Sequence, residues 1–215
     1  MTKTQLKITE IFYSIQGEST FVGLPTVFIR LTGCPLRCTW CDTEYAFSGG
    51  QWMDIDSIIA QAKQHQTPYI CVTGGEPLAQ KRCLQLLDKL IEHGFTVTLE
   101  TSGALPLVNV NDKVITIMDL KAPGSGEEQK NLYENINYLD AKDQIKFVLK
   151  DRTDYHWCQD IIQRYNLTDK CEVLLSPVAN TLKAADLAQW ILDDKLLVRM
   201  QLQLHKILWD DAQGR

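Results

Sequence analysis

The sequence predicts an α/β fold, an open and partial barrel of parallel strands, with about six or seven strands joined by helices. Strand-like runs alternate with amphipathic helical runs along the chain, and such alternation produces right-handed crossovers and a parallel sheet. The chain has 215 residues, whereas a closed eight-stranded barrel takes roughly 250. In either form, residues that follow the strands should line the active site.

The predicted strands are short runs rich in apolar and β-branched residues. They are residues 27–31, 69–73, 95–99, 114–118, 145–149, 172–175 and 198–204. A further strand-like segment follows residues 1–5.

Helical segments lie between these strands. Asp54 is a suitable N-cap for a helix that carries Ile55, Ile58, Ile59 and Ala62 on one face. The later helical segments are residues 79–93, 127–139, 153–165 and 183–192.

Composition predicts one domain, residues 1–215, with a sizeable core, because 45% of the residues are hydrophobic. The net charge is −5 and no basic stripe occurs, so a dedicated nucleic-acid binder is not expected. No apolar run reaches the roughly 18–20 residues of a membrane span. The first residues do not resemble a signal peptide, and a cytoplasmic location is therefore expected.

Three cysteines form the strongest signal. Cys34, Cys38 and Cys41 have the spacing C-x3-C-x2-C. Three thiolates can hold three irons of a 4Fe–4S cube and leave the fourth iron open, whereas electron-carrying clusters normally have four protein ligands. Zinc, with His65 as the nearest candidate for a fourth ligand, and a disulfide are the alternatives. The remaining cysteines are expected to be small buried hydrophobes; they are Cys71, Cys83, Cys158 and Cys171.

Polar or glycine-rich segments follow four of the predicted strands directly. They are the cysteine run and residues 74–76, 100–102 and 119–121. Since the carboxyl ends of parallel strands meet at one edge, these segments should converge at one mouth. The two glycines at 74–75 would let the backbone approach a ligand closely, although a simple strand-to-helix turn would also use them.

The cysteine loop with an aromatic residue at Trp40, together with the Gly-Gly-Glu-Pro run at residues 74–77, resembles the radical S-adenosylmethionine (SAM) superfamily. The resemblance implies that the three cysteines hold a 4Fe–4S cluster. It also implies that S-adenosylmethionine chelates the fourth iron and is cleaved to a 5′-deoxyadenosyl radical, which abstracts a hydrogen atom.

A closer resemblance, over nearly the whole chain, is to the 7-carboxy-7-deazaguanine synthase family. It is carried by residues 10–18, Arg30, residues 41–43 and residues 201–206. It implies a lyase that converts 6-carboxy-5,6,7,8-tetrahydropterin to 7-carboxy-7-deazaguanine and ammonia in the pathway to 7-deazapurines such as queuosine. It further implies Mg²⁺, a homodimer and an electron donor such as flavodoxin. A glycyl-radical activating enzyme acting on a protein partner is the alternative enzyme, and an iron–sulfur carrier or zinc module is the alternative class.

The resemblance also implies a substrate site. Arg30 offers a planar charged fork for the substrate carboxylate, with a strand-edge surface arginine as the alternative. Ile15, Gln16 and Gly17 would face the pterin edge, or else form a plain turn. The hydroxyl of Thr73 would bond the substrate, although a β-branched strand residue is equally often structural.

The implied cofactor and metal contacts lie on the following loops. Thr43 would bind Mg²⁺ through its hydroxyl, and the backbone at Trp40, Cys41 and Asp42 would frame the adenine. Gly75 would meet the methionyl end.

For three residues two interpretations are open: they contact the cofactor, or they form an ordinary capped strand end with a surface lysine. Glu100 and Ser102 would hold the ribose hydroxyls, and Lys121 would contact the cofactor. Glu100 has a second expected role as the catalytic residue that moves protons. His205 is expected to be a packed side chain late in the last strand.

Overall fold

The computed structural model describes residues 4–210 and 212–214; residues 1–3, which contribute to the expectation that no signal peptide opens the chain, lie outside the described residues. Its strands form one sheet in the order β3-β1-β2-β4-β5-β6-β7-β8-β9. The bounds are β1 Gln5–Ile15, β2 Pro25–Leu31, β3 Gln51–Asp54, β4 Tyr69–Gly74, β5 Thr96–Thr101, β6 Ile115–Asp119, β7 Gln144–Leu149, β8 Glu172–Pro177 and β9 Arg199–Met200.

The strands from β2 to β9 in this order all pair in parallel. Strand β1 pairs antiparallel with both β2 and β3. The central strand β4 reads Tyr-Ile-Cys-Val-Thr-Gly and is buried through its middle, as expected for a parallel strand covered on both faces. The open parallel barrel predicted from the sequence is therefore confirmed.

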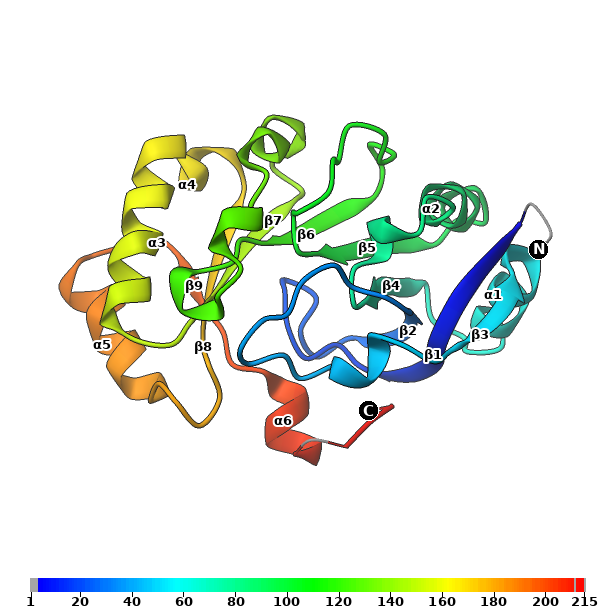
Figure 1. Ribbon diagram of the computed structural model, residues 1–215, viewed down its shortest axis with the longest axis horizontal. Helices are drawn as coiled ribbons and strands as arrows, with labels where there is room; N and C mark the ends of the chain where they lie inside the picture. Colours follow the sequence, from blue (N-terminus) through cyan, green and yellow to red (C-terminus); the bar gives the residue numbers. More distant parts are fainter. Residues whose placement is uncertain (1–3, 211, 215) are drawn as a thin grey trace.

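Helices cover the outer face of the curved sheet (Figure 1). They are α1 Ile55–Ala62, α2 Cys83–Glu92, α3 Arg152–Tyr165, α4 Leu167–Lys170 and α5 Ala184–Asp193. Asp54 is the N-cap residue of α1, and the apolar face predicted for that helix is buried. The last helix, α6 Leu204–Trp209, lies apart from this layer, below the sheet in Figure 1.

Two buried clusters fill the space between the helices and the sheet. One joins α1 and α2 to strands β1, β2, β4 and β5, with Leu87 and Ile29 among its members. The other joins α3 and α5 to strands β6, β7 and β8, with Phe147 and Tyr155 at its centre. The core thus lies on one face of the sheet, and the other face is left for the site. No helix in the described part of the chain is long and apolar enough to cross a membrane.

Three details of the prediction are wrong. The sheet also holds β3, which the sequence did not predict, because its four residues show no periodicity that separates them from a loop. Residues 198–204 hold only the two-residue strand β9, and Leu204 already begins α6. Residues 127–139 form 3-10 turns at Glu128–Lys130 and Tyr133–Tyr138 rather than an α-helix.

The side chain of Asn135 explains the last difference. Its Oδ1 accepts a hydrogen bond from the backbone of Leu107 at 2.9 Å, and its Nδ2 donates to the carbonyls of Gly103 and Leu105. Asn131 bonds both the N–H and the carbonyl of Lys121 in the same way. Asparagine side chains that bond distant backbone in this manner hold the segment in an irregular path instead of a helix.

Candidate active site

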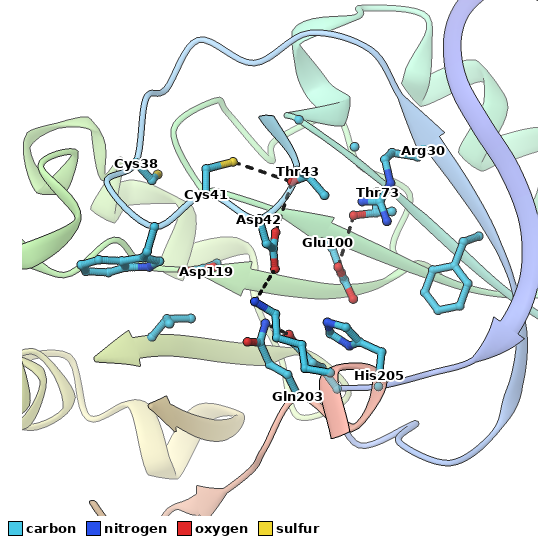
Figure 2. Close-up of a pocket in the computed structure, with 18 of the residues that line it drawn as sticks. Arg30, Cys38, Cys41, Asp42, Thr43, Thr73, Glu100, Asp119, Gln203 and His205 are labelled. Atoms are coloured by element: carbon cyan, nitrogen blue, oxygen red, sulfur yellow. Dashed lines mark hydrogen bonds and ion pairs between the residues drawn. The ribbon is translucent and has the colours of Figure 1, made fainter. Parts of the chain in front are cut away.

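A cavity of about 510 Å³ opens at the carboxyl ends of the parallel strands, a volume usual for a small-molecule site. It is lined by the loops that follow β2, β4, β5 and β6, by the turn after β1, and by α6 with residues 212–214. Every residue that the sequence predicts for the site lines this one cavity, and Figure 2 shows several of them, among them Arg30, Thr43 and Glu100. The predicted residues are Ile15, Gln16, Gly17, Arg30, Cys34, Cys38, Trp40, Cys41, Asp42, Thr43, Thr73, Gly75, Glu100, Ser102 and Lys121.

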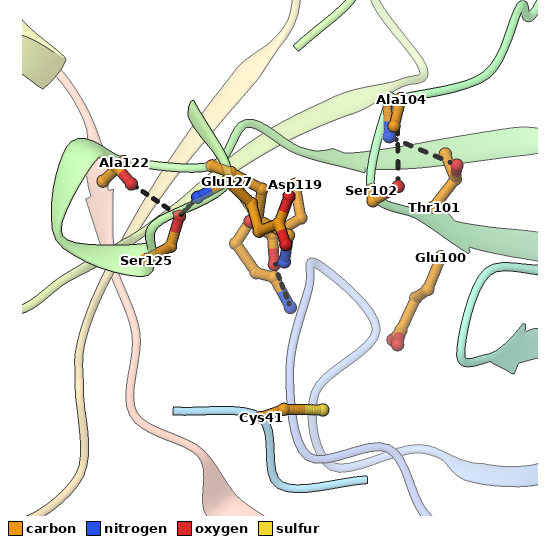
Figure 3. Close-up of polar contacts among 12 residues, drawn as sticks. Cys41, Glu100, Thr101, Ser102, Ala104, Asp119, Ala122, Ser125 and Glu127 are labelled. Carbon is orange, nitrogen blue, oxygen red and sulfur yellow. Dashed lines mark hydrogen bonds and ion pairs between the residues drawn. The ribbon is translucent and has the colours of Figure 1, made fainter. Parts of the chain in front are cut away.

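The cysteine loop begins directly after β2 and is held from both sides. The N–H of Gly33 donates to the carbonyl of Ala46 at 2.7 Å. On the other side, the N–H of Thr39 donates to the carbonyl of Ser125 at 3.0 Å, and the N–H of Arg37 donates to the carboxylate of Glu127 at 2.6 Å. The segment that bears Ser125 and Glu127, folded back on itself through the Ser125 hydroxyl, is visible in Figure 3. This segment therefore braces the loop.

The three cysteines suit a cube-shaped iron–sulfur cluster. All three are unpaired, partly exposed and on the same cavity, whereas the other four cysteines are buried as predicted. Burial raises the pKa of the Cys34 and Cys38 thiols, so bound iron would supply the charge that keeps them as thiolates. Among the described residues no three His, Cys, Asp or Glu side chains converge on one metal ion; in a cube each cysteine binds a different iron. His65, the candidate fourth zinc ligand, stacks on Tyr13 instead, with ring centroids 5.1 Å apart.

The glycine turn after β4 packs directly against the cysteine loop. A Cβ at Gly75 would lie 2.5 Å from the carbonyl oxygen of Gly33 and 2.7 Å from Cβ of Cys34. The N–H of Glu76 donates to that same carbonyl at 2.8 Å. Because the two backbones touch, only glycine fits at position 75, and the turn is more than a simple strand-to-helix connection.

Glu76, a member of the Gly-Gly-Glu-Pro run to which the sequence assigned no role, ties this turn to the end of β5. Its side chain is fully buried. The carboxylate accepts hydrogen bonds from the Thr101 hydroxyl at 2.9 Å and from the N–H and hydroxyl of Ser102 at 2.7 and 2.5 Å. Figure 3 shows Thr101 and Ser102 at this strand end. Since the Ser102 hydroxyl already donates to Glu76, it can only accept a hydrogen bond from a ligand.

Arg30 lines the cavity from the inner strand β2 and is only partly exposed, so the alternative of a strand-edge surface arginine is wrong. Its side chain is 15% exposed, and its Nε donates to Oε1 of Glu10 at 2.7 Å. The hydroxyl of Tyr45 donates to the same oxygen at 2.8 Å. The guanidinium lies over the rings of Phe12 and Tyr45, 5.7 and 5.9 Å from their centres. Burial works against the charge, but Tyr45, Glu10 and Glu100 together raise the pKa of Arg30.

Thr73 and Glu100 lie beside Arg30. Arg30 and Thr73 are register partners on β2 and β4, and the Thr73 hydroxyl donates to Oε2 of Glu100 at 3.2 Å. Figure 2 shows the Glu100 carboxylate directed toward Thr73 within the cavity. The two expected roles of Glu100, proton transfer and a ribose contact, stay predictions.

The turn after β1 offers a hydrogen-bond donor to the cavity, the side-chain amide nitrogen of Gln16. Oε1 of Gln16 accepts from the N–H of Glu18 at 3.2 Å, while Nε2 of Gln16 is buried and has no hydrogen-bond partner among the described residues. The carbonyl of Gly17 accepts from the N–H of Leu204 at 2.9 Å. A side chain at Gly17 would collide with the ring of His205. His205 lies on helix α6, and not in the strand that the sequence predicted, and it lines the cavity.

The largest feature that sequence reasoning missed is a buried ion pair. Nζ of Lys146 donates to Oε2 of Glu18 at 2.5 Å, and Nε2 of Gln203 donates to Oε1 at 2.8 Å. Nζ of Lys146 is also 3.8 Å from Oδ2 of Asp119, which Lys121 contacts at 3.0 Å. Oδ1 of Asp119 is buried without a partner among the described residues.

Burial and charge set the ionisation of this cluster. Burial alone would raise the pKa of Glu18, but the charge and hydrogen bond of Lys146 and the hydrogen bond of Gln203 lower it to about 2. Burial would lower the pKa of Lys146, yet Glu18, Asp119 and Glu100 raise it well above its usual value. For Lys121, burial is likewise outweighed by Asp119, and its pKa is raised.

Thr43 and Asp42 follow the last cysteine. The Thr43 hydroxyl lies 3.8 Å from Sγ of Cys41 and donates to Oδ1 of Asp42 at 3.3 Å. Nζ of Lys206, on α6, is 3.8 Å from Oδ2 of Asp42. These contacts, drawn in Figure 2, leave oxygen atoms of both residues on the cavity wall, where a hard cation could bind.

Comparison with known proteins gives a consistent result. Residues 28–120 match the radical SAM superfamily. The chain is 43% identical over 220 residues to 7-carboxy-7-deazaguanine synthase of Koribacter versatilis, with 95% of this chain and 97% of the relative covered. It is 42% identical over 217 residues to the enzyme of that name from Chlorobaculum tepidum, with 99% of each covered. Among solved structures, QueE from Escherichia coli shares the fold, with a TM-score of 0.78 and 23% identity over 94% of this chain and 95% of that one.

Proposed function

This chain belongs to the 7-carboxy-7-deazaguanine synthase family of the radical SAM superfamily, and we propose how its cavity converts 6-carboxy-5,6,7,8-tetrahydropterin to 7-carboxy-7-deazaguanine and ammonia. It is a radical SAM lyase of 7-deazapurine biosynthesis, which includes the pathway to queuosine. One observation carries the proposal: the cysteine loop, the glycine turn, Arg30 and Gln16, whose Nε2 has no hydrogen-bond partner among the described residues, line one cavity.

The half of the cavity near the cysteine loop is assigned to the cofactors. Cys34, Cys38 and Cys41 would hold the 4Fe–4S cluster, and the close-packed turn at Gly75 would leave backbone room for the methionyl group of S-adenosylmethionine. Bound together, the cluster and S-adenosylmethionine supply one-electron hydrogen abstraction. Lys121 and Asp119, whose Oδ1 is buried without a partner in the described part of the chain, line the same cavity. The protein contributes binding, orientation and exclusion of water.

The other half is assigned to the substrate. Arg30 uses its Nε to bond Glu10, so its terminal N–H groups are the ones that would bind the substrate carboxylate. Nε2 of Gln16 would donate to the ring carbonyl, and the carboxylate of Glu18 would accept the neighbouring ring N–H and amino groups. An acceptor pair beside a donor is the complement of a guanine-like edge.

Two further roles complete the assignment. Thr43, with Asp42 as an outer partner, would share Mg²⁺ with the substrate carboxylate, because Mg²⁺ prefers oxygen ligands and keeps several of them from water or substrate. Glu100, held through Oε2 by Thr73, would take up and return the proton that the ring rearrangement moves. The Ile15 backbone would support the ring, and the Trp40–Asp42 backbone would frame the adenine.

The same resemblance supports the setting that we propose for the enzyme. It would act as a homodimer in the cytoplasm with an electron donor of the flavodoxin kind. The seven cysteines that the structure describes are all free thiols, which suits a reducing compartment.

The test is anaerobic reconstitution with iron, sulfide, S-adenosylmethionine, Mg²⁺ and 6-carboxytetrahydropterin, followed by mass spectrometry of the product. We expect 7-carboxy-7-deazaguanine with far less than one equivalent of 5′-deoxyadenosine, because S-adenosylmethionine is regenerated. Cys38→Ala should abolish turnover, while Cys171→Ala, in the core and away from the cavity, should retain it. Absence of the deazaguanine product from loaded wild-type enzyme would overturn the proposal.

A further inference from the structure

The segment that joins β1 to β2 reaches across to the far side of the sheet. The N–H of Ser19 donates to Oε1 of Gln201 at 2.8 Å, and the N–H of Thr20 donates to Oε1 of Gln144 at 3.0 Å. Glu18 is the charged member of this segment, and its partner Lys146 is 128 positions away on β7. Both side chains are about 10% exposed (10% and 11%) and both line the cavity. Replacing either partner alone would therefore leave a buried, uncompensated charge.

Titratable groups from three further elements face this pair. Lys146 approaches Glu18 from β7, and Asp119 approaches Lys146 from β6 at 3.8 Å. Glu100 on β5 raises the pKa of Lys146, and His205 on α6 lies close enough to Glu18 to lower the pKa of that carboxyl. Gln203 supplies the second hydrogen bond to the Glu18 carboxylate. Lys146 supplies the short ion-pair contact in this group, so the charge on Glu18 depends chiefly on Lys146.

We propose that Lys146 is a positioning residue that determines specificity, because it holds Glu18 as a fixed anion beside the Gln16 amide and so selects ligands whose ring edge carries two neighbouring N–H donors next to a carbonyl. The inference rests on the proposed function and deepens it. According to this inference, Lys146 on β7 controls which heterocycle the cavity accepts, although it is remote in sequence from the turn after β1.

Two structural facts support this assignment. First, Oε1 of Gln16 is occupied by the N–H of Glu18 itself, so the position of Glu18 also decides which way the Gln16 amide points. Second, each Glu18 oxygen accepts one protein hydrogen bond, whereas an ionised carboxylate can accept about four. The carboxylate thus keeps capacity for two ligand donors while its orientation is set by the protein.

Loss of the Lys146 charge would change the protonation state of Glu18, and with it the hydrogen bonds that the turn after β1 offers to a ligand. A buried carboxylate without a cationic partner takes up a proton, and a protonated Glu18 would present a donor to the donors of the ring. Because ionisation returns at high pH, recognition should then depend on pH. This dependence separates control of ligand recognition from a purely structural role, which would not follow the protonation of Glu18.

The experiment uses loaded enzyme and two stable ligands: 7-carboxy-7-deazaguanine and its analogue without the 2-amino group, measured by calorimetry between pH 6 and pH 9. We expect wild-type enzyme to prefer the amino ligand roughly 10- to 100-fold, the size of hydrogen bonds to a charged group. Lys146→Met should lose this preference at neutral pH and regain part of it as pH rises. Lys146→Arg, which keeps the charge, should retain most of the preference.

A double variant and a control make the result decisive. Glu18→Gln with Lys146→Met removes both charges, so it should fold but bind the two ligands equally well. Lys142→Met removes a lysine that bonds Asp140 and Asp143 outside the cavity, and its ligand preference should match wild type.

Two outcomes would refute the role of Lys146. In the first, the double variant prefers the amino ligand as strongly as wild type does. In the second, Lys146→Met lowers the affinity for both ligands equally at every pH. Failure of the proposed function is a separate result, since it appears as wild-type enzyme that forms no deazaguanine product, whatever the ligand preferences are.

Discussion

Three cavity residues share one arrangement. In each, one polar atom of the side chain is bonded to the protein, and another polar atom of the same side chain is available to a ligand. Arg30 bonds Glu10 through Nε. Gln16 is anchored through Oε1 and has an unpartnered Nε2 among the described residues. Asp119 is contacted at Oδ2 by Lys121, and its Oδ1 is buried without a partner in the same part of the structure. Anchoring lowers the entropy lost on binding, because the rotamer is already fixed before the ligand arrives.

For Arg30 this arrangement gives a first prediction. Arg30→Ala should lower kcat/KM for the carboxytetrahydropterin by about 100-fold or more, the scale expected when a charge-assisted, bidentate contact is lost. Cleavage of S-adenosylmethionine without substrate should persist, because Arg30 faces the substrate half. Arg30→Lys should recover little, since an ammonium cannot reproduce the fork.

The control is Arg199→Ala, which removes an exposed ion pair with Glu172 at the far edge of the sheet and should leave turnover unchanged. Steady-state kinetics and quantification of 5′-deoxyadenosine provide both readouts. Equal loss of substrate turnover and of uncoupled cleavage in Arg30→Ala would contradict the assignment.

At this scale the sequence predicted the residues that lie in short motifs and missed those joined only by the fold. Cys34, Gly75 and Arg30 lie in or beside a recognisable motif or strand end. Glu18 and Lys146 are 128 positions apart, and each alone looks like an ordinary charged residue. Lys146 does sit inside a predicted buried strand, which is the one signal that could have identified it, because buried lysines are rare unless they are paired.

At the scale of elements, the ends of neighbouring strands are locked together by the turn that bears Gly75 and Glu76. Gly75 touches the cysteine loop after β2, and Glu76 bonds the end of β5. Three consecutive strand ends are thus held in one rigid layer beneath the cofactor half of the cavity. Rigid support of this kind is what holds a reactive group within the narrow geometry that catalysis needs.

Gly75→Ala tests this contact. The added Cβ would fall 2.5 Å from the Gly33 carbonyl oxygen, and neither backbone can move without shifting the cysteine loop. We expect incomplete cluster loading, measured as iron per chain and as visible absorbance, and loss of S-adenosylmethionine cleavage.

Gly94→Ala is the matched control, because that glycine follows α2 with φ of +81° and an added Cβ there would meet nothing within 4 Å. It should cost about 1 kcal/mol of stability, the usual penalty for alanine at positive φ, and load iron normally. Full cluster loading in Gly75→Ala would show that the close approach is not needed.

Element prediction succeeded where burial imposes a strong pattern and failed where side chains direct the path. The parallel strands are buried on both faces and read as apolar runs. Strand β3 is short and half exposed, so its sequence carries little pattern. The stretch from 127 to 139 looks helical, yet Asn131 and Asn135 bond backbone in other segments, and no local rule foresees those partners.

At the scale of the whole molecule, one sheet carries both halves of the site. The substrate half depends on β1, β2 and β7 through Gln16, Arg30 and Lys146, and the cofactor half depends on the loops after β2, β4 and β6. The turn after β1 and the C-terminal helix α6 meet at Gly17 and Leu204. Segments far apart in the sequence, the turn after β1 and helix α6, therefore line the same cavity.

This architecture predicts that residues 1–215 unfold as one cooperative unit. The two buried clusters both pack on the unbroken sheet, and they share Leu78 and Val110 as partly buried members. Hydrogen exchange with mass spectrometry across a urea titration of the cluster-free protein measures this directly. Peptides from β2 and from β8 should lose protection at the same urea concentration, since coincident transitions by separate probes mark two-state unfolding. Leu87→Ala, in the cluster around α2, should lower the stability of both regions together by about 2–5 kcal/mol. If β8 stays protected after β2 has unfolded, or if Leu87→Ala weakens only the first region, the chain consists of two units, and the cavity would then lie at the junction of two separately folding parts.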